Sequence, residues 1–219
     1  MSDYQTDELL TARAGGGVLK HRLLLLRHGE TLWSKSRQHT SATDLELTET
    51  GRMQAKLTAK VLDGLSLYNP LVISSPRQRA QTTAELAGLT VEVVSPLLAE
   101  WDYGEYEGLT TLQIRERVPG WLLWRDGCPG GESVQQVSDR ADAAIEMALA
   151  PMASRDVVFV GHGHFSRAVV SRWLELPLPQ GIRFEMVAAS IAVCGFERGE
   201  RQLAALGLTG YDHPCLPAT

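Results

Sequence analysis

The sequence predicts an α/β fold: a single-domain three-layer sandwich with a mostly parallel central sheet and helices on both faces. Short, continuously apolar runs alternate with segments whose apolar residues recur at helical spacing. The length of 219 residues suits one domain with a sizeable core. We therefore expect a flexible tail over residues 1–20 and one domain over residues 21–219.

The apolar runs predict the strands of this sheet. The run Leu23-Leu24-Leu25-Leu26 is the clearest, because a strand that is buried on both faces is continuously apolar. We expect strands over residues 22–26, 71–73, 91–94, 157–160, 190–196 and 202–206. The apolar stretch 191–194 is the expected edge at which a second copy of the chain could pair to form a homodimer.

Four segments between these runs are expected to be helices. Three of them carry apolar stripes. The fourth follows the run at 157–160 and extends to about residue 174. The stripes consist of Met53, Leu57 and Val61; of Ala80, Ala84 and Ala87; and of Val134, Val137, Ala141, Ala144 and Ala148. The stretch over about 97–131 differs, because it is rich in glycine and aromatic residues. We expect it to be a lid over a site rather than a core element, with its aromatic side chains shaping a substrate pocket.

Composition excludes several classes of protein. The formal net charge of −5 argues against a general nucleic-acid binder. The apolar run near the N-terminus is too short to span a membrane and lacks the flanks of a signal peptide. Cys128, Cys194 and Cys215 do not form a disulfide or zinc-binding pattern. We expect a cytoplasmic protein with no nucleic-acid or membrane partner.

Residues with distinctive chemistry follow three of the expected strands. Arg27 and His28 follow the first, Arg77 and Arg79 follow the second, and His162 follows the run at 157–160. Ligands of open α/β sheets bind at the carboxyl ends of the strands. Because these groups are cationic or can donate hydrogen bonds, their convergence predicts an anion site.

Each of these residues has a specific expected role. A neutral ring nitrogen of His28 can attack phosphorus while Arg27 neutralises the phosphoryl oxygens. Arg79 lies at the start of a helix, where free N–H groups also attract anions. Glu100 lies among aromatic residues and could protonate a leaving oxygen. Taken singly, each could be an ordinary residue, and Asp102, Glu105 and Glu107 are rivals of Glu100.

The segment Gly161-His162-Gly163-His164 has three interpretations. It could place a phosphate-binding histidine at a strand end, or it could be a damaged dinucleotide-binding motif in which Ser166 replaces the third glycine. It could also bind a metal ion, although no further ligand motif accompanies it. The sequence contains no Walker A loop, which binds nucleotide phosphates, and no G-x-S-x-G elbow, which carries the serine nucleophile of many hydrolases.

These segments together resemble the histidine phosphatase superfamily, also called phosphoglycerate mutase-like, from about residue 21 to about residue 208. The matching segments are Arg27-His28-Gly29-Glu30-Thr31; Leu47-Thr48 with Gly51 and Gln54-Ala55; Ser75-Pro76 with Arg79-Ala80 and Thr83-Ala84; Glu100 with Tyr103-Gly104 and Glu107-Gly108; Gly131-Glu132-Ser133; and Gly161-His162-Gly163.

The resemblance implies that His28 is phosphorylated, that Arg27, Arg79 and His162 bind the phosphoryl group, and that Glu100 is the proton donor. Residues expected to bind substrate or phosphate are Ser34, Thr40, Tyr103 and Gly163. Ser34 replaces the asparagine that is common in the family, and Arg77 replaces a leucine. Segments around Trp33, Arg77 and Trp124 resemble the subgroup of broad-specificity acid phosphatases and sedoheptulose-bisphosphatase-like enzymes.

The expected function is a metal-independent phosphomonoesterase of the acid phosphatase type, acting on small phosphorylated metabolites through a phosphohistidine, without a cofactor. A cofactor-dependent phosphoglycerate mutase is the first alternative. The resemblance implies that a mutase would carry a longer, basic insertion before Gly131-Glu132-Ser133. Here that interval is short, and its only basic residues are Arg115, Arg117 and Arg125. A non-catalytic protein that binds phosphorylated ligands is the second alternative, and a dinucleotide-binding enzyme is a distant third. The sequence leaves the substrate and the roles of Arg77 and His164 open.

Overall fold

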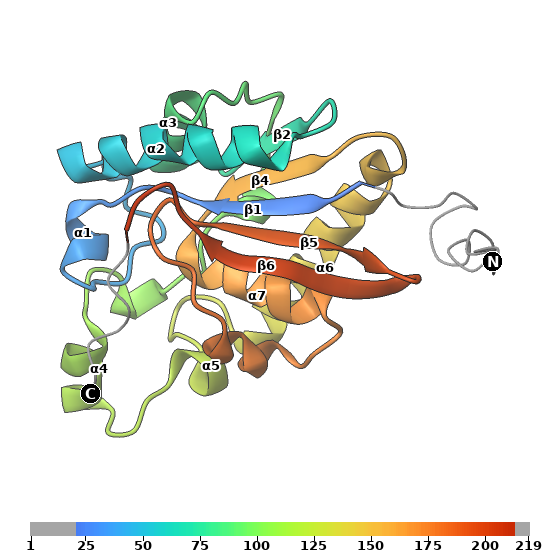
Figure 1. The fold of residues 1–219 in the computed structure, drawn as a ribbon. Coiled ribbons are helices and arrows are strands. Elements are labelled where there is room, and N and C mark those ends of the chain that lie inside the picture. The colour runs from blue at the N-terminus through green and yellow to red at the C-terminus, as the bar shows by residue number, and fades with distance from the viewer. Residues whose placement is uncertain (1–20, 213–219) are drawn as a thin grey trace, which may run out of the picture.

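The fold is a six-stranded sheet between two layers of helices, seen in a computed structural model that describes residues 21–212 (Figure 1). The strand order is β3-β2-β4-β1-β5-β6, in which β3, β2, β4 and β1 pair in parallel and β5 pairs antiparallel with both β1 and β6. The strands are β1 (Leu23–Arg27), β2 (Leu71–Ser74), β3 (Val93–Val94), β4 (Val157–Gly161), β5 (Ile191–Glu197) and β6 (Glu200–Leu208). The predicted fold class is confirmed, whereas the tail over residues 1–20, His213 and Cys215 lie outside the described residues.

The side chains of β1 alternate between two hydrophobic clusters, as the geometry of a strand requires. Leu24 and Leu26 face the layer that contains α2 (Glu49–Leu65) and α3 (Gln78–Leu86). Leu23 and Leu25 face the layer that contains α6 (Val134–Leu149) and α7 (Gly163–Trp173). The two layers lie on opposite faces of the sheet in Figure 1. Shorter helices are α1 (Leu32–Lys35), α4 (Thr111–Arg117) and α5 (Leu123–Asp126), and 3₁₀ turns span Pro96–Leu98, Gly104–Tyr106, Pro151–Ala153 and Leu178–Arg183.

The register of the parallel strands brings their carboxyl ends to the same edge of the sheet. Arg27 of β1 pairs with Gly161 of β4, and Ser74 of β2 pairs with Val160 of the same strand. The residues that follow are therefore neighbours, although they are far apart in the sequence. This edge lies beside α1 in Figure 1, where β1 leads into that helix.

The apolar stripe predicted for α2 is not its buried face. Met53 is 58% exposed, whereas Gly51, Ala55, Thr58 and Leu62 are buried. The reason is close packing at the first turn of the helix, where a Cβ atom on Gly51 would lie 2.1 Å from the carbonyl oxygen of Glu30. Small residues therefore face the sheet, because bulkier ones would not fit between the helix and the segment that follows β1.

The aromatic residues of the segment 97–131 are buried, contrary to the expectation that they belong to a lid rather than to the core. They belong to the larger hydrophobic cluster and include Trp101, Tyr103, Tyr106, Trp121 and Trp124. Indole N–H groups bond to backbone carbonyls, so that Trp101 donates to Glu132 and Trp121 donates to Gly127. The segment therefore extends the hydrophobic core, because a glycine-rich chain can fold tightly around large side chains. It also supplies residues to the site.

The predicted sheet edge is also corrected. The stretch 191–194 lies in β5, which pairs with β1 on one side and with β6 on the other. The edge strands are β3 and β6, and a homodimer stays a prediction. Cys128 and Cys194 are buried free thiols. None of the helices in the described residues combines the length and the apolar character needed to cross a membrane.

Candidate active site

Buried nitrogen atoms without partners gather where the parallel strands end. In residues 21–212, the side-chain nitrogens that are buried and make no hydrogen bond are Nε of Arg27, Arg77 and Arg79 and Nδ1 of His162. Buried polar groups are almost always paired, so a cluster of unpaired N–H groups requires an explanation. An anion that accepts from them would supply it, because every guanidinium Nε–H is a donor.

His28 presents a neutral ring to this cluster. Its Nδ1 lies 2.7 Å from the carbonyl oxygen of Gly29, which can only accept, so Nδ1 carries the proton and Nε2 keeps its lone pair. Burial lowers the pKa of His28 well below 6.5, and the charges of Arg79 and Arg27 lower it further. The backbone beside it is held by a hydrogen bond of 3.0 Å from Gly29 N to Thr83 Oγ1. An unprotonated ring nitrogen is the form that can act as a nucleophile.

His162 lies next to His28, with ring centroids 5.2 Å apart. Its Nε2 lies 2.7 Å from the hydroxyl oxygen of Ser75, the first residue after β2. Burial lowers the pKa of His162 well below 6.5, assisted by the charge of Arg79. At neutral pH, His162 can therefore bind an anion by donating a hydrogen bond from its ring rather than by carrying a positive charge.

Both predicted arginines of the site are fixed by backbone carbonyls. The Nη1 atom of Arg27 donates to the carbonyl oxygen of Met186 at 2.5 Å. The Nη1 atom of Arg79 donates to Thr43 at 2.8 Å, and its Nη2 atom lies 3.3 Å from the carbonyl oxygens of both Thr40 and Ser41. Because these bonds use Nη atoms, the Nε atoms stay available to a ligand. Arg79 is fully buried, and burial lowers its pKa.

Glu100 is anchored at the start of α7. Its carboxylate accepts the backbone N–H groups of Trp101 at 3.0 Å, His164 at 3.1 Å and Phe165 at 2.7 Å. It also lines the pocket above His28. The rival acids are placed differently. Asp102 and Glu105 are exposed, and the carboxylate of Glu107 is occupied by the backbone of residues 41–43.

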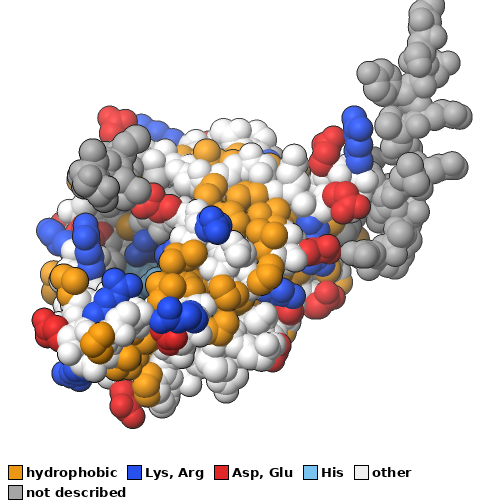
Figure 2. Space-filling model, turned by 90° about the horizontal axis from the view of Figure 1, so that it is seen from below, with side chains coloured by type: hydrophobic (Ala, Val, Ile, Leu, Met, Phe, Trp, Pro, Cys, Tyr) orange, Lys and Arg blue, Asp and Glu red, His pale blue; other side chains and the backbone are white. Residues whose placement is uncertain are grey.

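A pocket of about 430 Å³ opens above these groups. Figure 2 shows a hollow in which a histidine side chain is visible and around which Lys and Arg side chains gather. The predicted residues Ser34, Thr40, Tyr103 and Gly163 all line this pocket, together with Arg27, His28 and Glu100. Arg79 and His162 are fully buried beneath it. The structure therefore brings together all nine predicted site residues.

Comparisons with known proteins agree with this geometry. A model of the histidine phosphatase superfamily, branch 1, matches residues 23–209. The chain belongs to this superfamily. It is accordingly an enzyme of the phosphoric monoester hydrolase type.

Several relatives cover most of the chain. An acid phosphatase of Mycobacterium tuberculosis is 64% identical over 198 residues, which are 90% of this chain and 98% of the relative. A sedoheptulose 1,7-bisphosphatase of Saccharomyces cerevisiae is 35% identical, over 72% of this chain and 69% of the relative. The solved structure of an open reading frame product of M. tuberculosis has a TM-score of 0.86 and 64% identity, covering 88% of this chain and 100% of that one.

The pocket of this histidine phosphatase contains a residue that the sequence did not reveal. His39 lines the pocket, is only 7% exposed, and has its ring 4.6 Å from that of Tyr103. Burial lowers the pKa of His39 to about 4. The hydroxyl of Tyr103 in turn lies 2.6 Å from Nδ1 of His164. The only available signal was the position of His39 in the long loop after β1, which is too general to identify a contact.

The wall of the pocket carries charged side chains rather than the aromatic ones that were expected. Of the five aromatic residues expected to shape it, only Tyr103 lines the pocket. Arg167 lines it and is held by the carbonyl oxygens of Gly181 at 3.1 Å and Ile182 at 3.0 Å. Its guanidinium carbon lies 4.8 Å from the ring centre of Trp124. Trp124 therefore supports a charged residue of the pocket wall and does not line the pocket itself.

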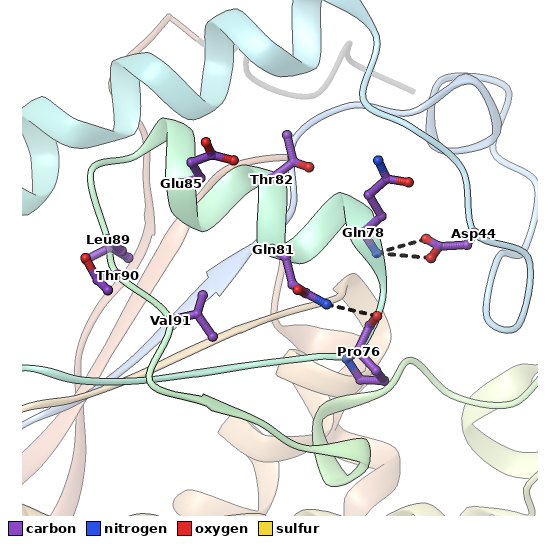
Figure 3. A pocket seen from close by; sticks show the side chains of 9 residues that line it. All are labelled: Asp44, Pro76, Gln78, Gln81, Thr82, Glu85, Leu89, Thr90 and Val91. Atoms are coloured by element: carbon purple, nitrogen blue, oxygen red, sulfur yellow. Dashed lines mark hydrogen bonds between the residues drawn. The ribbon is translucent and has the colours of Figure 1, made fainter.

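A separate cavity of about 560 Å³ lies between α3 and the segment that precedes β3 (Figure 3). Its lining residues include Asp44, Gln78 and Glu85 but no cationic side chain. A phosphate group would find no charged donor in this cavity, in contrast to the pocket above His28. In the described residues, no group of three or more His, Cys, Asp and Glu side chains could hold a metal ion.

Proposed function

We propose that this enzyme is a metal-independent acid phosphatase that hydrolyses small phosphorylated metabolites through a phosphohistidine on His28. The unpaired Nε atoms of Arg27 and Arg79 and the unpaired Nδ1 of His162 carry this proposal, because they form a cradle for a phosphoryl group beside a nucleophilic ring. Arginine is suited to this task because its planar guanidinium matches the geometry of phosphate oxygens. The guanidinium groups supply the charge neutralisation for which other phosphatases use a metal ion.

The reaction has two steps. In the first, Nε2 of His28 forms a bond to phosphorus while the bond to the leaving oxygen breaks, and Glu100 gives its proton to that oxygen. In the second, Glu100 takes a proton from water, the resulting hydroxide oxygen bonds to phosphorus, and the N–P bond breaks. Inorganic phosphate then leaves, and both side chains return to their starting states. The arginines stabilise charge on the equatorial oxygens throughout.

A pH optimum below neutral is consistent with this mechanism. The lowered pKa of His28 keeps its ring nitrogen unprotonated at acid pH. A nucleophile that stays available below pH 6.5 is compatible with a reaction that also needs a proton donor in its acid form. A flat rate profile up to pH 9 would count against Glu100 as the acid.

The test is phosphate release from p-nitrophenyl phosphate, 3-phosphoglycerate and a sugar bisphosphate, at pH 5 to 8 with EDTA present. Wild type should release phosphate, and His28→Ala should not. Rapid quenching with a radiolabelled substrate should trap a phosphoryl group on wild type that is stable in base and labile in acid, as expected for a phosphohistidine. An unchanged rate in His28→Ala would refute the mechanism.

Other outcomes of the same assay identify the alternatives. Conversion of 3-phosphoglycerate to 2-phosphoglycerate only after addition of a bisphosphate primer would indicate a mutase. Binding of phosphate without either reaction would indicate a non-catalytic protein.

A cytoplasmic location also stays a prediction, supported by the buried free thiols Cys128 and Cys194.

A further inference from the structure

A single peptide group connects Glu107 to the buried guanidinium of Arg79. The carbonyl oxygen of Thr40 lies 3.3 Å from Nη2 of Arg79. The N–H of the same peptide group, which belongs to Ser41, lies 3.0 Å from Oε1 and 2.9 Å from Oε2 of Glu107. The peptide dipole therefore has its positive end at a carboxylate and its negative end at a guanidinium, which is the favourable orientation at both ends.

Thr43 also contacts both Glu107 and Arg79, through two consecutive peptide groups. Thr43 donates its N–H to Oε1 of Glu107 at 3.0 Å, and its carbonyl oxygen accepts from Nη1 of Arg79 at 2.8 Å. The hydroxyl of Ser41 donates to Oε2 of Glu107 at 2.6 Å. We name residues 40–43 the clamp loop. The loop uses its N–H groups for Glu107 and its carbonyl groups for Arg79.

The clamp loop is fixed at its far end by Asp44. The carboxylate of Asp44 accepts the backbone N–H of Gln78 at 3.0 and 3.1 Å, the dashed contacts in Figure 3. One of its oxygens lies 3.8 Å from Nη1 of Arg79. Asp44 therefore holds the end of the loop, but it does not touch the N–H groups of Ser41 and Thr43, for which Glu107 is the acceptor.

Glu107 is suited to hold this loop during catalysis in acid. Burial raises the pKa of Glu107, but the hydrogen bonds from Ser41 and Thr43 outweigh it, so the net pKa lies below the ordinary value of 4.5. The side chain therefore remains a carboxylate over the working range of an acid phosphatase. A neutral amide could not replace it, because its NH₂ group would face an N–H donor.

We propose that Glu107 is a positioning residue, which holds the clamp loop so that its carbonyl groups fix Arg79 with Nε directed at the phosphoryl group. This inference rests on the proposed function, in which Arg79 binds phosphate. Glu107 does not touch the substrate, and its effect passes through the peptide group between Thr40 and Ser41. Loss of the Glu107 carboxylate should therefore weaken phosphate binding by no more than the amount that Arg79 contributes to that binding.

The test compares Glu107→Gln with wild type by isothermal titration with inorganic phosphate. We expect the dissociation constant to rise about tenfold, which corresponds to about 1.4 kcal/mol, because Glu107 acts on phosphate only through the position of Arg79. The matched control is Glu105→Gln, which makes the same change at an exposed side chain two positions away. It should leave the dissociation constant within about twofold of wild type.

A double-mutant cycle separates positioning of Arg79 from general loss of structure. In an Arg79→Gln background, Glu107→Gln should weaken phosphate binding by less than about twofold, because the group that it positions is already gone. An equal factor in both backgrounds would overturn the proposal, and so would unchanged binding in the single variant. If Glu107→Gln does not fold, Ser41→Ala replaces it in the same cycle, with the same non-additivity expected. Because binding is measured without turnover, a failure of the phosphatase chemistry would be seen separately.

Discussion

The carboxylate of Glu100 accepts the backbone N–H of Phe165 at 2.7 Å, so the expected proton donor is tied to the first turn of α7. The same helix begins directly after His162. A change in the position of α7 would therefore move Glu100 and His162 together.

Glu100→Gln should slow the enzyme in a way that depends on the leaving group. The amide keeps an oxygen that can accept from Phe165 but has no proton to give. General acid help contributes about 10²- to 10⁴-fold, so hydrolysis of an alkyl phosphate such as glycerol 3-phosphate should fall by that factor. Hydrolysis of p-nitrophenyl phosphate should fall much less, because its leaving group departs as a stable anion. The measurement is kcat/KM over a series of leaving groups, and an equal loss for all of them would contradict the assignment.

Arg167→Gln should change the choice of substrate. The guanidinium of Arg167 lines the pocket and is fixed there by the carbonyl oxygen of Gly181, and we expect it to bind the leaving group of the substrate. For a leaving group that carries a carboxylate or a second phosphate, one lost charge-assisted bond predicts a fall in kcat/KM of roughly tenfold relative to p-nitrophenyl phosphate. Arg183→Gln, at an exposed position nearby in the fold, is the control. A ratio of kcat/KM values that does not move would show that Arg167 does not contact the leaving group.

His39 should make the folded state sensitive to acid. Its folded pKa of about 4 lies below the ordinary value of 6.5, so the unfolded chain binds more protons and stability falls as the pH drops through this interval. At pH 5 the loss relative to neutral pH is about 2 kcal/mol from this residue. His39→Gln should therefore lose about 2 kcal/mol less than wild type between pH 7 and pH 5 in urea unfolding. Parallel losses in the two proteins would argue against this titration.

Gly51→Ala should destabilise the protein, although alanine favours helices. The added Cβ atom would lie 2.1 Å from the carbonyl oxygen of Glu30, a backbone atom that can move only together with the neighbouring segment of the site. Overpacking of this kind costs typically about 1–3 kcal/mol. Gly64→Ala, in the same helix with nothing within 4 Å of the added atom, should stabilise the protein by up to about 1 kcal/mol. Thermal unfolding of the two variants measures the contrast, and a Gly51→Ala variant as stable as Gly64→Ala would contradict the close packing.

Sequence reasoning located the centre of the site because the information there is local. An apolar strand followed at once by Arg27 and His28 fixes where those side chains emerge, and parallel pairing brings the ends of β1, β2 and β4 together. The resemblance to a family added Glu100, which no periodicity would have selected among four neighbouring acids. The alanine stripes of α3 and α6 are buried as predicted.

What the sequence did not determine depends on contacts between distant segments. His39 is buried because the chain around Tyr103 folds over it. Met53 is exposed because the first turn of α2 approaches the backbone of Glu30 closely, so that a stripe of long side chains cannot face inward. The link from Glu107 to Arg79 runs through a peptide group that any residue could provide. The sequence by itself predicted which groups would carry the chemistry and determined at which edge of the sheet they lie. Only the tertiary structure decided which backbone groups hold them, because hydrogen bonds to the backbone leave no trace in the identity of the residue that supplies them.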